Sequence, residues 1–166
     1  PNLIPSGLNH AHMTIQRETE DLLTDFAENP GAEHSQLEFK SKEILQTTGQ
    51  KKKVVRILSA MANQSGGTMI IGVRHQDGGL LYQTFSPDDE PRQELTHVAQ
   101  QYTSPQLQNF WDISFEECMG HRVLRIDVDQ VQQRLIQVDY EGEYQVWIRD
   151  EDGMREMTSG EIDQFY

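Results

Sequence analysis

The stretch SAMANQSGGTMIIGV, residues 59–73, contains the two elements that decide the fold. Its first part completes a run from Lys51 to Asn63 in which apolar residues recur at helical spacing, so we predict a helix over 51–63. The glycines of QSGG end this helix, because glycine is common just beyond a helix C-terminus. The unbroken apolar run TMIIGV then predicts a buried strand over 68–73. The stretch therefore joins a helix to a buried strand through a short glycine turn.

The segments on both sides of this stretch alternate between helical and strand patterns. Upstream we predict a helix over 14–27, which NPG ends, and a short strand over 36–40. Downstream the expected elements are a turn over 74–79, a strand over 80–85, a helix from Asp88 or Asp89 to about Tyr102 with Pro91 in its first turn, strands over 110–117 and 122–129, a hairpin of 135–140 with 144–150, and a helix over 158–166 that opens on a capping box of Thr158 and Glu161. This order predicts an α+β fold, a single domain over residues 13–166 with a mixed β-sheet and helices packed on it.

Length and composition narrow the class of protein. A chain of 166 residues fits one domain with its own core. No stretch approaches the length of a membrane span, and the single cysteine, Cys118, excludes an internal disulfide framework. We therefore expect a cytoplasmic protein that does not contact a membrane. We interpret residues 1–12, PNLIPSGLNHAH, as a tag remnant or a disordered leader before Met13.

The charge balance is strongly acidic. The chain has 27 acidic and 14 basic residues and a formal net charge of −13, and its five lysines all lie between Lys40 and Lys53. Such acidity argues against a general nucleic-acid binder, but it leaves room for one whose basic residues are gathered in one place. The composition suits a halophilic source, where salt screens the self-repulsion, and equally an ordinary acidic protein.

Two possible phosphate or metal motifs lie near the central stretch. NQSGGT follows a helix and lacks the Gly-Lys-Ser/Thr ending of a phosphate loop, so it does not indicate ATP binding. Glu33 precedes the short strand over 36–40 and Glu38 lies within it. Divalent cations such as Mg²⁺ are often held by one or two carboxylates plus a substrate phosphate. If this strand neighbours the buried one, Asp77 or His75 of the following turn could supply a third group. The alternative is that these glutamates are solvated surface charges.

Three blocks of the sequence together resemble the Schlafen AlbA-type domain family. The blocks are ExxxxEFK over 33–40, SAMANQSGGTMIIGV, and VWIRDEDGMREMTSGEI over 146–162. The family shows a Glu-x4-Glu-Phe-Lys step, an SAFANT-GG segment, an IGV strand followed by acidic residues, and a late YIR…R hairpin. The blocks follow the family's order and the resemblance covers about residues 18–166.

The resemblance implies the α+β lobe of the Schlafen core and a nuclease site. Nuclease members use two glutamates and an aspartate, with bound divalent metal, to cut transfer or ribosomal RNA. By position, the glutamates are Glu33 and Glu38. The aspartate is expected two residues after IGV, where this chain has His75, and Asp77 follows two residues later. A slip in the turn would bring Asp77 into the site, and His75 would otherwise act as a base or ligand.

The basic residues are candidates for contacts to RNA phosphates. Lys40 belongs to the family's own step and would contact phosphate beside the metal. The further candidates are Lys42, Lys51, Lys52, Lys53, Arg56, Arg149 and Arg155. The alternative is that these charges provide solubility and that residues 51–53 are simply the first turn of the helix. Tyr102, Trp111 and Trp147 are expected in the core rather than as platforms for bases.

These observations give two main expectations for function. The first is a Schlafen-like endoribonuclease acting on structured RNA, transfer RNA before ribosomal RNA, with Mg²⁺ or Mn²⁺ at Glu33, Glu38 and Asp77. The alternative is a non-catalytic nucleic-acid-binding or regulatory module of the same fold, and a purely structural interaction domain is a third possibility. We also expect a homodimer, because two lobes form the RNA cradle of Schlafen proteins and this chain has the length of one.

Overall fold

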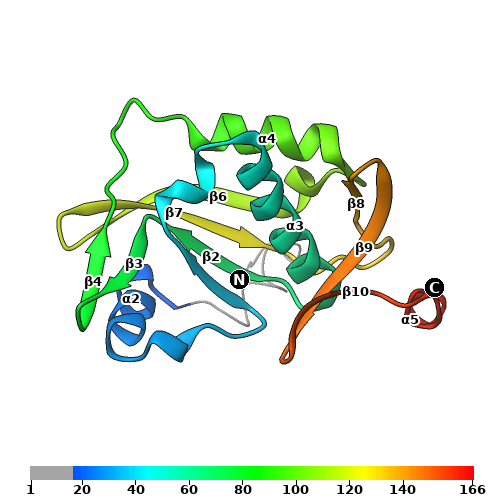
Figure 1. The fold of residues 1–166 in the computed structure, drawn as a ribbon, viewed down its shortest axis with the longest axis horizontal. Helices are drawn as coiled ribbons and strands as arrows, with labels where there is room; N and C mark the ends of the chain where they lie inside the picture. The colour runs from blue at the N-terminus through cyan, green and yellow to red at the C-terminus, as the bar shows by residue number, and fades with distance from the viewer. Residues whose placement is uncertain (1–16) are drawn as a thin grey trace, which may run out of the picture.

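A mixed four-stranded sheet forms the centre of the structure, a computed structural model that describes residues 17–166 (Figure 1). Its strands lie in the order β1-β2-β7-β6, with β1 parallel to β2 and the other pairs antiparallel. Their bounds are β1 (Leu37–Lys40), β2 (Gly67–Ile71), β6 (Trp111–Cys118) and β7 (His121–Val128). The predicted α+β fold with a mixed sheet is confirmed. The expectations for residues 1–12 and for the start of the first helix lie outside the described residues.

A second four-stranded sheet and a hairpin complete the β structure. The second sheet is antiparallel in the order β10-β9-β8-β5, and the hairpin pairs β3 with β4. The strands are β3 (Val73–Gln76), β4 (Gly79–Tyr82), β5 (Thr103–Ser104), β8 (Gln137–Tyr140), β9 (Glu143–Asp150) and β10 (Gly153–Glu156). The predicted strand over 80–85 therefore ends at Tyr82, and the predicted turn over 74–79 is wrong for its first three residues, which belong to β3.

Gly72 causes this difference from the sequence prediction. Its φ of +114° is a conformation that residues with a side chain rarely adopt, and it separates β2 from β3. An added Cβ would also lie 3.2 Å from the carbonyl oxygen of Gln83. The chain therefore leaves the central sheet at Gly72 and continues as a separate hairpin.

The helices agree with the predicted order, with changes at their ends. They are α2 (Thr19–Glu28), α3 (Thr48–Gln64), α4 (Pro91–Tyr102) and α5 (Ser159–Phe165), with short 3-10 helices η1 (Pro30–Ala32), η2 (Lys42–Leu45) and η3 (Leu107–Phe110). α3 begins three residues before the predicted start because the hydroxyl of Thr47 accepts a bond from Gln50 N and caps it. The capping box of α5 is confirmed. The predicted aspartate cap of α4 is wrong, because Glu90 holds that position without a side-chain bond.

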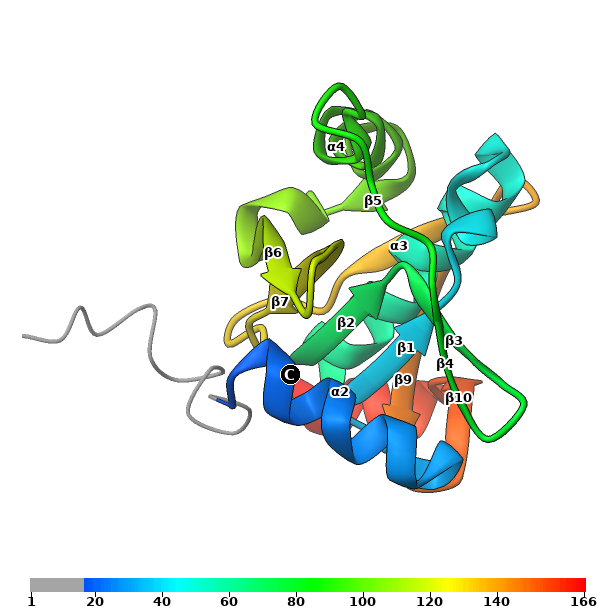
Figure 2. The same cartoon turned by 90° about the vertical axis from the view of Figure 1, so that its left-hand side faces the viewer.

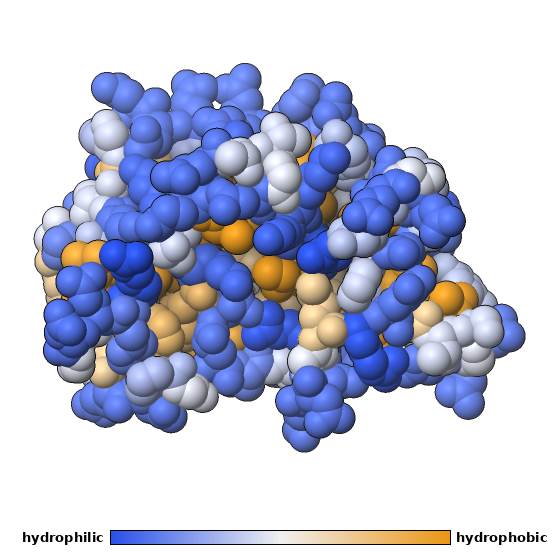
Figure 3. Space-filling model, in the orientation of Figure 1, coloured by the Kyte–Doolittle hydropathy of each residue, from blue (hydrophilic) through white to orange (hydrophobic). Residues whose placement is uncertain are grey.

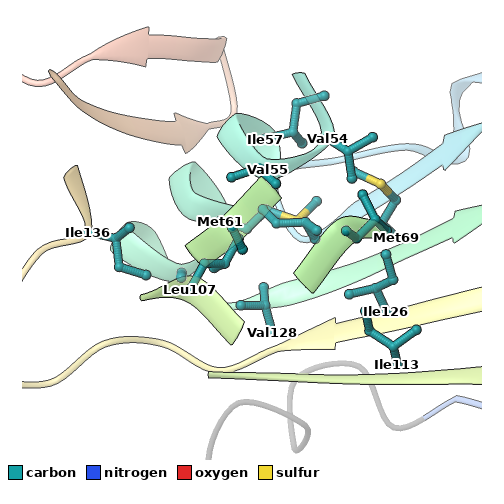
Figure 4. Close-up of a cluster of buried hydrophobic side chains, with 14 of the residues drawn as sticks. Val54, Val55, Ile57, Met61, Met69, Leu107, Ile113, Ile126, Val128 and Ile136 are labelled. Carbon is teal, nitrogen blue, oxygen red and sulfur yellow. The ribbon is translucent and has the colours of Figure 1, made fainter. Parts of the chain in front are cut away.

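The hydrophobic core lies on both faces of the central sheet. Neighbouring strand residues point to opposite faces, so Met69 of β2 packs in a large cluster with α3 while Ile70 packs with α2 in a second cluster. Figure 4 shows Met69 beside Val54, with Ile126 of β7 below them. On the face of the molecule seen in Figure 3, polar residues cover most of the surface and apolar residues show between them near the centre.

The central stretch of sequence is also held by polar and close backbone contacts. The buried Asn63 donates to the carbonyl oxygens of Ile136 (3.0 Å) and Trp147 (2.9 Å), and accepts a bond from Ile136 N (2.7 Å). These bonds tie the end of α3 to the second sheet. At Gly67 an added Cβ would lie 2.7 Å from the carbonyl oxygen of Gln36, so only glycine fits this approach. The sequence NQSGG therefore sets how helix and sheets meet.

Candidate functional site

Glu38 lies buried between the two sheets. Leu37 and Phe39 pack in the α2 cluster, so the alternation along β1 turns Glu38 to the other face. The residue is only 7% exposed. A buried carboxylate requires charged or hydrogen-bonding partners, because losing water is costly for the charged form. The contacts around Glu38 therefore decide what this position can do.

Two cations neutralise Glu38. The Arg149 guanidinium, which comes from β9, forms a close ion pair with Oε1, and Lys40 Nζ lies 3.4 Å from Oε2. Arg149 Nη2 also donates to the carbonyl oxygen of His34 at 3.1 Å. These bonds join the edge of the central sheet to the second sheet, because β1 and β9 belong to different sheets. Arg149, predicted as an RNA contact, is thus a partner of the carboxylate.

Glu33 lies against Glu38, as the sequence predicts for a carboxylate pair. Its Oε2 accepts a hydrogen bond from Phe39 N at 2.8 Å, which holds the loop against β1. Burial raises the pKa of Glu33 to about 7, and the hydrogen bond with Glu38 acts in the same direction. Burial also acts to raise the pKa of Glu38, but the bond from Glu33 and the charges of Arg149 and Lys40 outweigh it, so this pKa is lowered. Near neutral pH the pair therefore holds a proton on Glu33 for part of the time.

An open depression lies beside this pair. Its volume is about 380 Å³, and its lining includes Glu33, His34, Ser35 and Arg149. Asp150, Glu151 and Gly153 of the β9–β10 hairpin complete the wall. The site is thus accessible to a ligand at Glu33 and Arg149, whereas Glu38 lies beneath them.

The predicted third member of the metal site does not join the pair. Asp77 is exposed in the β3–β4 turn, with a φ of +49°. His75 lies on β3, where its Nε2 contacts the carbonyl oxygen of Phe26 and its ring meets the Phe26 ring edge-on at 4.5 Å. Figure 1 shows the β3–β4 and β9–β10 hairpins well apart. The slip that would bring Asp77 in does not occur, because Gln76 remains paired in β3 before the turn begins.

The residues present do not form the three-ligand set that a Schlafen-type metal site would need. Within residues 17–166, no group of three or more His, Cys, Asp or Glu side chains could hold a metal ion. Both oxygens of Glu38 already face cations, which supply the positive charge that a metal would otherwise bring. The structure therefore brings together Glu33 and Glu38, but not Asp77 or His75.

Most of the predicted RNA-contacting cations also pair with acidic side chains. Lys42 lies 3.2 Å from Asp89, and Lys51 lies 2.8 Å from Glu94. Arg155 pairs with Asp150 and, through two parallel hydrogen bonds of 2.7 Å, with Glu161 of the capping box. These charges are compensated within the domain. They are poorly placed to attract phosphate, since each already has an opposite charge beside it.

Three of the predicted cations differ from the others. Among the ion pairs of residues 17–166, none involves Lys52, Lys53 or Arg56, which lie on two turns near the start of α3. Lys53 is exposed, and the other two are half-buried. We call these three residues the α3 cationic surface. Figure 2 shows the start of α3 beside the β8–β9 turn.

Aromatic rings hold two of these cations in place. The Arg56 guanidinium lies over the rings of Tyr140 (4.7 Å) and Trp147 (5.3 Å), and Lys52 Nζ lies 3.9 Å from the centre of the Tyr102 ring. Trp147 and Tyr102, expected in the core, are half-buried with a cation against each ring. Sequence reasoning missed Tyr140, whose only signal was an aromatic residue at a hairpin turn.

Comparison with known proteins identifies the family. Residues 33–158 match the domain family described as Schlafen, AlbA_2. The chain belongs to the Schlafen AlbA_2 family. The match begins at Glu33 and ends at Thr158, so it includes the carboxylate pair, the α3 cationic surface and Arg149. No curated protein matches the chain.

Solved structures show the same fold as this Schlafen AlbA_2 domain. The N-terminal domain of an ATP-dependent DNA helicase RecG-related protein from Nitrosomonas europaea has a TM-score of 0.61 at 20% identity, with 81% of this chain and 88% of that chain covered. The DIP2311 protein from Corynebacterium diphtheriae has a TM-score of 0.55 at 19% identity over 79% of this chain. The match covers 23% of the DIP2311 chain, so the domain corresponds to a part of that longer protein.

The two parts of the Schlafen AlbA_2 domain described above have different chemistry. The carboxylate pair can hold or release a proton at Glu33, because its pKa lies near neutral pH. The α3 cationic surface offers fixed positive charge to an anionic partner. Among the described residues, no helix has the length and apolar character that a membrane span needs.

Proposed function

We propose that this Schlafen AlbA_2 domain is a nucleic-acid-binding module that binds RNA through the α3 cationic surface. The observation that carries the proposal is the position of its uncompensated charge. The protein has a net charge of −13, and its other predicted phosphate contacts pair with carboxylates, whereas Lys52, Lys53 and Arg56 pair with none in residues 17–166. Cations without a protein counter-ion are those that neutralise phosphates and release bound salt ions.

The negative charge of the rest of the protein restricts where RNA can bind. Phosphate is repelled by most of a surface with this net charge, so an RNA strand would approach only where positive charge exceeds negative charge. The α3 cationic surface therefore favours one binding position and one orientation over many weak ones. This favours a specific module over a general nucleic-acid binder.

RNA binding by charge variants tests this proposal. Affinity for a labelled single-stranded RNA is measured by fluorescence anisotropy for the wild type and for Lys53→Glu. The expected loss for Lys53→Glu is about tenfold or more, because a phosphate contact is replaced by repulsion. Arg92→Glu is the matched control, since Arg92 is exposed on α4 and also has no ion pair within residues 17–166. Equal losses for both variants, or no binding by the wild type, would overturn the proposal.

RNA cleavage at the carboxylate pair is the second candidate function. It is favoured by the placement of Glu33 and Glu38 beside an open depression of about 380 Å³, with a pKa of about 7 at Glu33. That value suits a group that accepts a proton from an attacking hydroxyl. For this reaction, the resemblance to Schlafen nucleases implies Mg²⁺ or Mn²⁺ as the cofactor and transfer or ribosomal RNA as the substrate. The incomplete ligand set around the pair is the reason that we place cleavage second.

Incubation with transfer RNA tests the second candidate. Cleavage is followed on denaturing gels with Mg²⁺, with Mn²⁺ and with chelator, for the wild type and for Glu33→Gln. Metal-dependent products from the wild type that Glu33→Gln abolishes would support a nuclease. Intact RNA in every condition, together with measured binding, would leave the binding module as the function.

We also propose that the domain acts as a homodimer. One α3 cationic surface has three charges and would neutralise few phosphates, so a single copy would bind weakly. Two copies related by a two-fold axis would present two such surfaces to one RNA, and this is the commonest oligomer symmetry.

A further inference from the structure

The face of the β8–β9 hairpin that meets α3 has an exposed aromatic ring beside the cations. In the hairpin Tyr140 pairs with Glu143, and alternation along β9 places Trp147 on the same face as Glu143. Arg56 contacts both rings, so this face lies against α3. Tyr140 nevertheless stays 37% exposed. Its ring is therefore partly covered by Arg56 and partly open to a ligand.

A small cavity joins this ring to the α3 cationic surface. Its volume is about 240 Å³, and Tyr140 and Val138 line one side while Lys52, Lys53 and Arg56 line the other. Gly49, Asp139 and Glu141 complete the lining. The cavity thus has an aromatic and apolar wall opposite a cationic wall. Its volume suits a ligand that consists of one flat ring with an attached anionic group.

The two acidic residues of the lining orient a ligand in this cavity. Asp139 Oδ1 accepts a hydrogen bond from Gly142 N at 3.1 Å, which holds its carboxylate at the turn, on the hairpin side. Glu141 follows in the same turn. A phosphate is repelled from this side and attracted to α3, so an uncharged ring is left to meet Tyr140.

We propose that Tyr140 is a stacking platform for an unpaired base and that the ligand of this surface is a single-stranded nucleic acid. The proposal rests on the function proposed above and adds the class of ligand. Aromatic rings beside cationic side chains are the usual means of binding single strands, because every base has a flat face. Bases inside a duplex are already stacked and paired, so a duplex makes the phosphate contacts without the ring contact.

Binding of matched oligonucleotides tests the inference. The probes are a single strand of about 12 nucleotides, its abasic counterpart with the same phosphates, and the corresponding duplex. The wild type is expected to bind the single strand about tenfold more tightly than either of the other probes. Tyr140→Leu, which keeps apolar bulk without a ring, is expected to remove this preference. Tyr140→Phe is expected to retain it.

Two controls separate a lost ring from a damaged fold. Tyr144→Leu changes a residue that is 59% exposed on the same hairpin but does not line the cavity. It is expected to leave binding of all probes unchanged, and each variant's melting temperature is measured beside the wild type. Quenching of Trp147 fluorescence by the single strand, absent in Trp147→Phe, gives a second readout near Tyr140.

The outcomes distinguish this inference from the proposed function. Equal binding of the single strand and the abasic strand, with Lys53→Glu still weakening both, would overturn base stacking and leave nucleic-acid binding intact. No binding of any probe by the wild type would overturn both proposals. A loss of preference in folded Tyr140→Leu, with Tyr140→Phe and Tyr144→Leu unaffected, would support the inference.

Discussion

Replacing Glu33 with glutamine should change how the stability of the domain depends on pH. The pKa of Glu33 is raised from 4.5 to about 7 by burial and by its hydrogen bond with Glu38. A folded protein with this raised pKa keeps the full contribution of protonated Glu33 below about pH 4.5 and loses it as the pH rises to about 7. The side-chain amide of the Glu33→Gln variant resembles the protonated acid at every pH, because it donates to Glu38 and still accepts the bond from Phe39 N.

The size of the effect follows from the same values. One pKa unit corresponds to about 1.4 kcal/mol, so the rise from 4.5 to about 7 would give at most about 3–4 kcal/mol. Glu33 is only half-buried, and solvent screening reduces this to about 1–2 kcal/mol. The free energy of unfolding of Glu33→Gln, relative to the wild type, should therefore increase by this amount between about pH 5 and about pH 8.

Urea unfolding followed by circular dichroism at the two pH values measures this difference. The matching change in melting temperature is roughly 2–8 °C for a domain of this size. Glu156→Gln is the control, because Glu156 is exposed on β10 and its replacement should have the same small effect at both pH values. A relative stability of Glu33→Gln that is equal at the two pH values would refute the close contact of the two carboxylates.

Three further predictions concern charge and assembly. Arg149→Gln should lower the free energy of unfolding by about 3 kcal/mol in urea titrations, because the buried Glu38 keeps only Lys40 as a cationic partner; an unchanged value would argue against the ion pair. The melting temperature should rise between dilute buffer and about 1 M KCl, since salt screens the repulsion of a protein with net charge −13. A melting temperature that does not change with KCl concentration would contradict the hypothesis of halophilic adaptation. Light scattering should give twice the monomer mass of 19.1 kDa, and a monomer mass with and without RNA would exclude the dimer.

The order of elements could be predicted from the sequence because each has a strong local pattern. The α3–β2 unit depends on helical spacing, a glycine turn and an apolar run, which lie within one stretch of the chain. The β3 strand was missed because its polar residues resemble a turn. Gly72 has a positive φ and separates β3 from β2, and β3 pairs with β4 around a two-residue turn of Asp77 and Gly78, both with positive φ. Asp-Gly is a local hairpin signal, so attention to this turn type would have placed the strand.

The candidate site was predictable only in part. The pairing of Glu33 with Glu38 was expected from the Glu-x4-Glu-Phe-Lys step that resembles the Schlafen family. Arg149 meets Glu38 from more than a hundred residues away in the sequence. The role of Tyr140 depends on its contact with Arg56 of α3, which is also distant in the sequence. The sequence also cannot reveal which lysines have acidic neighbours. That property separates Lys53 from Lys51, two residues away on the same helix.

The salt dependence of RNA binding tests the central claim most directly, because it counts phosphate contacts. For single strands, the slope of log affinity against log salt concentration is about −0.7 for each phosphate neutralised. The wild type should therefore give a slope of about −2 for each α3 cationic surface that contacts the RNA, and Lys52→Ala/Lys53→Ala should reduce its magnitude by about 1.4 for each such surface. Arg92→Ala should leave the slope unchanged. A double variant with the slope of the wild type would contradict the claim that this surface binds nucleic acid.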